Sequence, residues 1–521
     1  MGEIWYGGTI YTMRHKGETT EAVYVTDGII TDIGTKQELF ARYEVQAEYD
    51  LKGDVMLPGL VDSHMHLIGH GERLMRLDLS GCASYGEMLA LVKERAEQTP
   101  KGEWIIGEGW NENVFCDTRQ VHANDLDAIS LEHPILLKRV CRHALLVNSY
   151  ILQWAGITEK TADPKGGKIG KGDDGKLNGI LYERAQELIQ GVVPGQTESY
   201  LQRALEIAVE DCWKNGLVGC HTEDLNYYGG FARTYQAFAK GLRNKPFKAH
   251  LLVHHEVIEE LAQYENGRYI EFGAMKIFVD GSLGGRTALL SQPYYDNPDT
   301  NGVAVFEREE LAALVQKARN LGLAVAVHAI GDLAFEYIIE AIERHPPKRG
   351  QRDRIIHCQV LRKDLIERAK KLSLVLDIQP VFVMSDFPSV IEKLGDGRLR
   401  YAYAWKTLLQ EGVMCAGGSD APIEPVGPLL GIYSAVTRKS ALDGKSYLPR
   451  EKLTVFEAVS LFTSGSAYAI YKENCRGKIE PGHEADFTVL DKDIFQIDPE
   501  DILQTEVIMT VVDGRAVYRK G

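Results

Sequence analysis

Two histidines stand two residues apart in the segment DSHMH, at His64 and His66. If this segment is a β-strand, alternate side chains project to one face, so both imidazoles point to the same side. Neutral imidazole is a common ligand of zinc and similar divalent ions. Such a pair is by itself a weak indication of a metal site, so its weight depends on where the strand lies.

A lysine within an apolar segment is the second residue that could do chemistry. Lys276 lies in GAMKIFVDGSLGGRT, with apolar neighbours on both sides. Burying an ammonium without a partner is costly. A lone lysine of this kind usually extends its amine to water or pairs with an acid. At this point both a structural and a chemical interpretation stay open.

Three further polar residues end apolar runs later in the chain. His328 closes LAVAVHA, His357 closes RIIHCQ and Asp420 closes CAGGSD. Taken singly, a histidine in an apolar strand is more often a satisfied core residue than a ligand. The interpretation therefore depends on whether these strand ends lie together.

The elements that must position these residues form a repeating pattern. Short β-branched runs followed by amphipathic helical segments indicate βα units and a parallel sheet. Eight candidate strands cover residues 59–66, 216–223, 248–255, 274–281, 323–329, 354–359, 372–379 and 413–420. Eight strands close a TIM barrel, whose active-site groups lie at the carboxyl ends of the strands. The polar residues would then share one end of a barrel, which packing alone does not explain.

Both ends of the chain have the pattern of small β units. Residues 1–57 contain AVYVTDGIITDIGT, and residues 471–521 contain VIMTVVDGRAVY. Each places Asp-Gly between alternating apolar runs, as a tight hairpin requires. We predict one β-sandwich built from both ends, with the barrel over residues 58–470; two separate small units would give a similar pattern.

The stretch from about 80 to 200 is longer than a crossover between barrel strands needs. It contains the strand-like segments WIIGEGW and PILLKRV, and DPKGGKIGKGDDGK, which has the composition of a surface loop. We interpret it as an insertion after the first barrel strand. Because it leaves the carboxyl end of that strand, we expect it over the mouth of the barrel.

The composition of the chain restricts the classes of molecule that it is expected to bind. The 521 residues include 59 Lys and Arg against 74 Asp and Glu, a net charge of −15, which opposes binding to nucleic acid or an anionic membrane. The 8 cysteines form no CxxC pair, which suits a reducing compartment. No apolar segment approaches the roughly 20 residues of a membrane span, and the start lacks a secretory signal. We expect a cytoplasmic protein with a small-molecule substrate; whether it forms a homo-oligomer stays open.

Several motifs together resemble a known family. PGLVDSHMH, KIFVDGSLG, HAIGD, IIHCQ and GSDAPIEP are similar to motifs of the amidohydrolase superfamily, in particular its YtcJ-like branch, amidohydrolase family 3. The likeness runs from VTDGIITDIG to IEPGHEADFTVLDKD, nearly the full chain. Motif order, strand positions and both flanking β segments agree with that family.

The resemblance implies a role for each motif residue. His64 and His66 would bind the more buried metal, and His328 and His357 the second. Lys276 would be carboxylated by carbon dioxide and bridge both ions as a carbamate. Negative charge directed at two cations would then offset the cost of burying this side chain. Two zinc ions are expected, with manganese, iron and cobalt as alternatives because they accept similar ligands.

The implied activity is metal-dependent hydrolysis of a C–N bond, in an amide or an N-formyl or N-acyl amine. A metal-bridging hydroxide would attack the carbonyl. Asp420 would bind one metal, accept the proton of the hydroxide and deliver it to the leaving nitrogen. One alternative is a deaminase of the same superfamily that uses one metal, against which the lysine argues. Another is a non-catalytic scaffold, which would have lost ligands.

Two segments of the insertion resemble recognition segments of the same branch. They are GWNENVF, with Trp110 and Asn111, and RHALLVNS, with His143. These three side chains are candidates to border the substrate pocket. An insertion core with Trp110 packed inside is an equally good interpretation of this residue.

Other residues near the predicted site have less specific patterns. Arg286, in the glycine-rich GSLGGRT, is a candidate clamp because guanidinium binds carboxylate through two nitrogens. The same loop also has the composition of a simple turn. The family pattern requires no ligand at His221, His254 or His255, so we expect them to be structural or to support the ligands.

Overall fold

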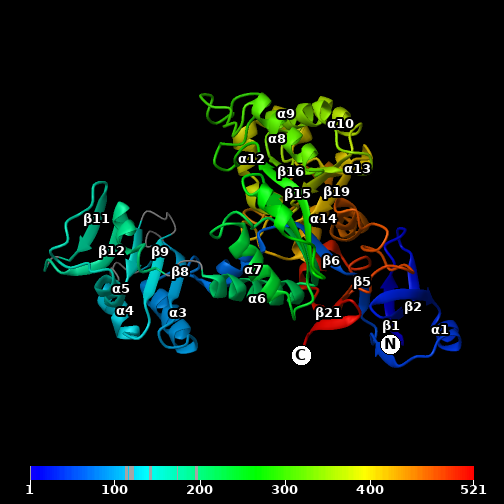
Figure 1. Cartoon of the computed structure of the whole chain (residues 1–521), viewed down its shortest axis with the longest axis horizontal. Helices are drawn as coiled ribbons and strands as arrows, with labels where there is room; N and C mark the ends of the chain where they lie inside the picture. Colours follow the sequence, from blue (N-terminus) through cyan, green and yellow to red (C-terminus); the bar gives the residue numbers. More distant parts are fainter. Residues whose placement is uncertain (1, 112–114, 117–121, 140–143, 173, 194–196) are drawn as a thin grey trace. The chain divides into compact units, whose positions relative to one another are not determined.

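The computed structural model describes residues 2–111, 115–116, 122–139, 144–172, 174–193 and 197–521 (Figure 1). The chain forms two compact units, one of residues 1–70 and 201–521 and the other of residues 71–200. The first contains the barrel and a sheet from both chain ends, and the second is the predicted insertion. The domain boundaries at 57/58 and 470/471 stay predictions.

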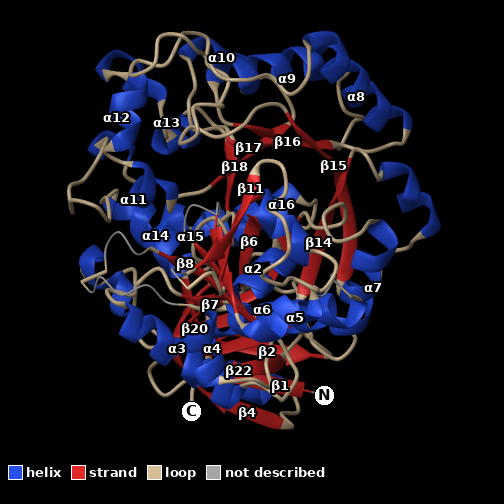
Figure 2. Cartoon of the chain, turned by 90° about the vertical axis from the view of Figure 1, so that its left-hand side faces the viewer, coloured by secondary structure: helices blue, strands red, loops and turns tan. Residues whose placement is uncertain are grey.

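The barrel is an eight-stranded sheet in which neighbouring strands are parallel, in the order β19-β18-β17-β16-β15-β14-β13-β6. Its strands are β6 (Leu60–Met65), β13 (Leu217–Thr222), β14 (Lys248–His254), β15 (Ile270–Phe278), β16 (Val325–Ala329), β17 (Asp353–His357), β18 (Leu374–Ile378) and β19 (Met414–Gly417). Figure 2 shows strands β14 to β18 with helices outside them. The predicted TIM barrel is confirmed, and most residues of its strands are buried because both faces of the sheet are covered.

The first and last strands meet at their carboxyl ends. The backbone N–H of Asp420 donates to the carbonyl of His64 (2.7 Å). The buried carboxylate of Asp62 accepts from the backbone N–H groups of His64 (3.0 Å) and Ser419 (3.0 Å). A side chain at Gly418 would place a Cβ 2.6 Å from the His64 nitrogen, so only glycine fits this close approach. This seam holds the two predicted site residues His64 and Asp420 side by side.

Helices cover the barrel strands. They include α7 (Phe231–Gly241), α8 (Arg308–Asn320), α9 (Asp332–Arg344), α10 (Lys363–Ala369), α13 (Trp405–Gln410) and α14 (Pro428–Thr437). In α8 the predicted apolar stripe is buried, at Leu311, Ala312, Val315 and Ala318. The chain leaves this helix at Gly322, whose φ of 77° is readily adopted by glycine. No helix in the described ranges combines the length and apolar character needed to cross a bilayer.

The two ends of the chain form a single eight-stranded sheet, so the predicted β segments of both termini join in one sheet domain. It contains β1 (Gly2–Tyr11), β2 (Thr19–Thr26), β3 (Ile29–Gly34), β4 (Ala47–Asp50), β5 (Val55–Pro58), β20 (Phe487–Leu490), β21 (Val507–Val512) and β22 (Arg515–Arg519). Strand β5 pairs with β20, which joins the two segments. Both predicted hairpin turns are present, with positive φ at Asp27, Gly28, Asp513 and Gly514.

The insertion has its own six-stranded sheet, in the order β11-β12-β10-β9-β8-β7. The strands are β7 (Leu77–Asp78), β8 (Ile105–Trp110), β9 (Ile135–Arg139), β10 (Ala144–Val147), β11 (Gly167–Lys171) and β12 (Leu177–Glu183), with α3 (Tyr85–Gln98) and α4 (Ala123–Ile129) among its helices. The predicted surface loop at 163–176 is partly wrong, because β11 pairs with β12. Ile169 is buried opposite Leu181, and this contact outweighs the loop-like composition.

Candidate active site

Six polar side chains converge at the carboxyl end of the barrel. They are His64 of β6, His66 directly after that strand, Lys276 of β15, His328 of β16, His357 of β17, and Asp420, which follows β19. The Lys276 amine lies 3.4 Å from Nε2 of His64, which lies 3.4 Å from Oδ1 of Asp420. Nε2 of His66 is 3.7 Å from the same oxygen. Ligand atoms of His64, His357 and Asp420 all lie within 4.8 Å of one another.

A closed circuit of seven rings passes around Lys276. In order, the rings belong to His64, His66, Tyr227, His254, Phe278, His328 and His357, which returns to His64. Neighbouring centroids are 4.5 to 6.3 Å apart. The Lys276 amine lies 4.6 Å from the centroid of Phe278. Four members are the predicted ligands, and the remaining three form the side of the circuit next to β13, β14 and β15.

Hydrogen bonds outside the circuit orient the imidazoles. Nδ1 of His66 lies 2.6 Å from the carbonyl of Glu223, and Nδ1 of His357 lies 2.8 Å from Oε1 of Gln379. Nε2 of His328 lies 3.0 Å from a main-chain carbonyl. A neutral imidazole that donates one N–H to a carbonyl leaves the lone pair of its other nitrogen free. Each ring can therefore direct a ligand nitrogen into the site.

Burial keeps the site bases uncharged. It lowers the pKa of His66 to about 4 and that of His328 to about 3, and it lowers the pKa values of His64 and His357 well below 6.5. The pKa of Lys276 is also lowered by burial. Neutral imidazole is the form that binds a metal, and a neutral amine is a nucleophile.

Two carboxylates act on Lys276. Burial raises the pKa of Asp420, opposed by the charge of Lys276. Glu223, directly after β13, is fully buried; its Oε2 accepts from the Tyr227 hydroxyl (2.7 Å), and its Oε1 has no hydrogen-bond partner in the described part of the chain. Glu223 and Tyr227 were missed by the sequence reasoning. The available signal was an acid at the end of the second predicted strand, in HTED.

A buried ion pair fills the barrel interior close to these imidazoles. Nε and Nη2 of Arg354 lie 2.8 and 3.0 Å from the two carboxylate oxygens of Asp377. Nη2 also donates to the carbonyl of Ser63 (2.6 Å), next to His64. This pair connects β17 and β18 to the strand that carries the histidine pair.

The other predicted site residues lie in different surroundings. Nε and Nη2 of Arg286 bind both oxygens of Asp296, at 3.1 and 2.7 Å, so its two-nitrogen fork is already occupied. Trp110 is 6% exposed and packs in the core of the insertion unit. Asn111 follows β8 at the edge of the described residues, and His143 lies outside them. The substrate-binding roles of these residues stay predictions.

The opposite end of the barrel has an internal cavity that is too small for a substrate. A cavity of about 30 Å³ lies there, lined by His221, His250 and Lys248 among others. That volume holds one or two water molecules, whereas small-molecule sites measure about 300–1,000 Å³. The six predicted site residues lie at the other, carboxyl end.

Comparison with known proteins agrees with this geometry. The pattern described as the amidohydrolase family matches residues 47–518. The chain is 53% identical to the putative amidohydrolase YtcJ of Bacillus subtilis, with 100% of both chains covered. The chain belongs to the amidohydrolase family. It is also 25% identical to the N-substituted formamide deformylase of Arthrobacter pascens, covering 98% of this chain and 97% of the relative.

A solved structure supports the same assignment. This amidohydrolase resembles an uncharacterized metal-dependent hydrolase from Pyrococcus horikoshii OT3 with a TM-score of 0.77 and 28% identity, over 96% of this chain and 99% of the other. The chain is therefore a metal-dependent hydrolase built on a TIM barrel.

The described residues fit a divalent ion. They offer neutral imidazole nitrogens and a carboxylate oxygen with ligand atoms within 4.8 Å of one another. This donor set suits zinc, manganese, iron and cobalt. The residues that orient the imidazoles, such as Gln379, form the supporting shell that metal-bound histidines usually have.

Proposed function

We propose that this amidohydrolase cleaves the C–N bond of an amide or of an N-formyl or N-acyl amine, with two divalent ions and a carboxylated lysine. The observation that carries the proposal is the environment of Lys276. Its amine is fully buried, contacts His64 and lies within the circuit of rings that includes four imidazoles. The relative named as an N-substituted formamide deformylase supports this class of substrate.

Lys276 supplies the nucleophile for its own modification. Burial lowers its pKa, which favours the neutral amine. The nitrogen lone pair attacks the carbon of CO₂, an N–C bond forms, one C=O pair moves to oxygen, and the nitrogen loses a proton to water. The product is a carbamate whose two oxygens share one negative charge where an amine stood. A deaminase with one metal needs no such group.

The four histidines and Asp420 would hold the ions together with this carbamate. Divalent ions bound there would lower the pKa of water toward about 7 and polarise a carbonyl oxygen. The histidines contribute by staying neutral and by keeping a fixed orientation. His66 and His357 are held by Glu223 and Gln379, so their ligand nitrogens do not have to reorganise on binding.

Asp420 is placed to move the proton. Its carboxylate lies at the seam between β6 and β19, 3.4 Å from Nε2 of His64, and burial raises its pKa toward the range in which a carboxyl group can both accept and release a proton near neutrality. In the proposed reaction it takes a proton from the attacking water and delivers it to the leaving nitrogen. One carboxylate then acts as base and afterwards as acid.

A substrate screen with elemental analysis tests the proposal. We expect about two equivalents of a divalent metal in the purified protein, and release of amine from N-formyl or N-acyl amines. Release of ammonia from an amidine-like substrate would instead indicate the deaminase. A fully metallated protein that hydrolyses none of these compounds would contradict an amidohydrolytic function.

The Asp420→Asn variant tests the proton role. We expect it to retain metal and to lose about 10²- to 10⁴-fold in kcat, the usual contribution of general acid–base catalysis. Asp443→Asn is the matched control, because Asp443 is exposed on the loop after α14. Activity of Asp420→Asn equal to that of the control would exclude the role.

A further inference from the structure

His254 occupies a position in the site that the predicted ligand set leaves unexplained. It ends β14 and pairs in register with Lys276 of β15. Leu252, two residues earlier on the same face, packs in the barrel interior with Ala274 and Ala326, so the His254 side chain also faces inward. Its ring lies between those of Tyr227 (6.3 Å) and Phe278 (5.9 Å) in the circuit around the lysine.

The tautomer of His254 is fixed by two donors. Its Nδ1 lies 3.2 Å from Nδ2 of Asn226 and 3.3 Å from the backbone N–H of Glu256. The same Asn226 nitrogen donates to Oε2 of Glu256 (2.8 Å), which establishes that it is the amide NH₂ that faces His254. Because Nδ1 accepts twice, the ring proton resides on Nε2. Burial lowers the pKa of His254 to about 4, so the ring stays neutral at physiological pH.

The Nε2–H group of His254 makes no hydrogen bond to any residue that the structure describes. Three other donors of the circuit are occupied: the Tyr227 hydroxyl binds Glu223, and His66 and His357 use their Nδ1–H groups on neighbouring acceptors. Nδ1 of His64 has no partner among the described residues but is completely buried. His254 is thus an oriented, neutral donor in the same circuit of rings as the four predicted histidine ligands.

We propose that His254 donates its Nε2–H to the carbonyl oxygen of the substrate, and that this bond strengthens as negative charge develops on that oxygen. The inference rests on the proposed function, since it assigns a subsite for the acyl group of the amide. A fixed donor directed at developing charge contributes about 10²- to 10³-fold to kcat. His254 would act as a catalytic residue that binds no metal.

Two substitutions of His254 by amide residues distinguish hydrogen-bond donation to the substrate from a role in packing. In His254→Gln the side-chain NH₂ can reach the position of Nε2, whereas in His254→Asn it reaches only that of Nδ1. With N-butylformamide as the substrate, we expect His254→Asn to lose about 10²- to 10³-fold in kcat with KM changed only a few-fold. His254→Gln should recover at least tenfold of that loss. Metal content and melting temperature should match the wild type in both; equal loss in both variants would overturn the proposal.

A second readout does not depend on turnover. Nitrogen-15 NMR of the zinc-loaded protein with ring-labelled histidine reports which nitrogen of His254 carries the proton. We expect the Nε2–H form, and a shift of that Nε2 signal when N-butylformamide is added. Asn226→Asp replaces the donor by an acceptor and should move the proton to Nδ1. An Nδ1–H wild-type ring, or an Nε2 signal unaffected by the amide, would overturn the proposal whether or not the amide is hydrolysed.

Discussion

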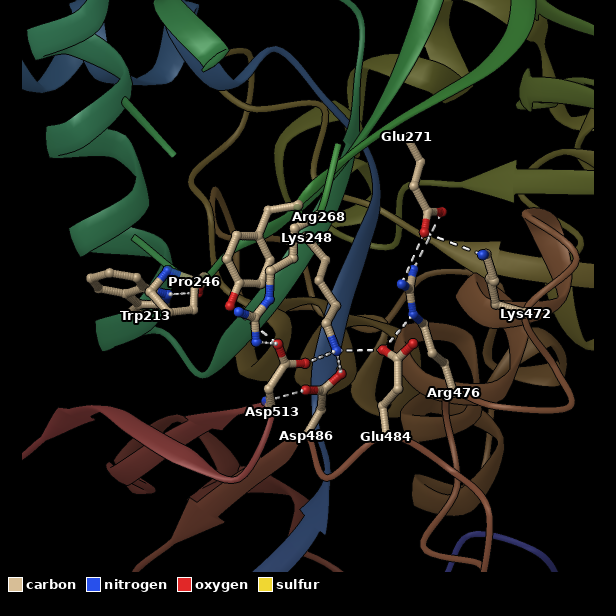
Figure 3. Close-up of polar contacts among 11 residues, drawn as sticks. Trp213, Pro246, Lys248, Arg268, Glu271, Lys472, Arg476, Glu484, Asp486 and Asp513 are labelled. Atoms are coloured by element: carbon tan, nitrogen blue, oxygen red, sulfur yellow. Dashed lines mark hydrogen bonds and ion pairs between the residues drawn. The ribbon is translucent and has the colours of Figure 1, made fainter. Parts of the chain in front are cut away.

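Replacing Lys248 by methionine is expected to destabilise the unit of residues 1–70 and 201–521. Lys248 begins β14, and its amine contacts three carboxylates of the C-terminal segment (Figure 3). These belong to Glu484, Asp486 (2.5 Å) and Asp513 (2.9 Å). The lysine side chain is 9% exposed, so the charges interact with little screening by water. The cluster connects the barrel to the terminal sheet.

The expected loss of stability depends on which polar partners each of the three carboxylates would keep in the Lys248→Met variant. Glu484 would still contact Arg476 (2.7 Å) and Asp513 would still contact Arg268 (3.3 Å). Asp486 would keep only the backbone N–H of Asp513 among the polar contacts found for it. Removing one partner of a buried ion pair costs about 3–5 kcal/mol. With an unfolding entropy of about 2.1 cal/mol/K per residue over this unit, the melting temperature should fall by about 4–6 °C.

Differential scanning calorimetry at pH 7 measures this effect. The control is Lys439→Met, because Lys439 pairs with Glu500 at 2.7 Å while their side chains are 37% and 50% exposed. Exposed pairs contribute about 0–1 kcal/mol, which corresponds to a shift of about 1 °C or less. Equal shifts in the two variants would refute the argument from burial.

Addition of calcium tests whether repulsion among the three carboxylates is what destabilises Lys248→Met. The oxygens of Glu484, Asp486 and Asp513 lie within 4.8 Å of one another, and the Lys248 amine contacts all three carboxylates. Without the lysine they form an oxygen cluster of the kind that binds Ca²⁺. Millimolar calcium should therefore raise the melting temperature of Lys248→Met and leave that of the wild type unchanged. A destabilised variant that does not respond to calcium would show that carboxylate repulsion is not the cause.

Three further predictions concern the barrel interior. Lys276→Gln cannot be carboxylated, so we expect at most half of the wild-type metal content by elemental analysis and no carbamate signal after ¹³C-bicarbonate labelling; a wild-type protein without that signal would contradict the modification. Gln379→Leu removes the acceptor that orients His357, and metal titration should show an affinity about 10- to 100-fold weaker. Arg354→Met leaves Asp377 buried and unpaired and should cost about 3–5 kcal/mol in denaturant unfolding, most of which the added change Asp377→Leu should restore.

The sequence was sufficient for the barrel and for the side chains on its strands. Short segments rich in apolar residues define these strands of four to nine residues, because both faces of a parallel sheet are buried. A polar residue that ends such a run marks the carboxyl end, as His328 and His357 do. The six predicted residues converge because barrel geometry brings all strand ends to one rim.

Contacts made by loops could not be predicted in the same way. Glu223 and Tyr227 lie after β13 and meet the site through a hydrogen bond that no periodic pattern indicates. The state of His254 depends on Asn226, which is 28 residues away in the sequence. The predicted carboxylate clamp at Arg286 illustrates the converse, because its pairing with Asp296 follows from the fold of one loop. Residue type alone does not show which partners a loop brings into contact.

Lys248 and Lys276 are buried at opposite ends of the barrel. Their different partners indicate a structural role for Lys248 and a chemical role for Lys276. Burial alone would lower the pKa of Lys248, but its three carboxylate partners together raise it above its ordinary value, so the ammonium is permanent. Lys276 is more deeply buried and forms no ion pair with a described carboxylate; its pKa is lowered and its near contact is an imidazole nitrogen. The carboxylates of Glu223 and Asp420 act on Lys276 through their charge, but among the described residues neither forms an ion pair with its amine, unlike the three carboxylates around Lys248. The unpaired amine is consistent with a side chain whose working form is the carbamate rather than the ammonium.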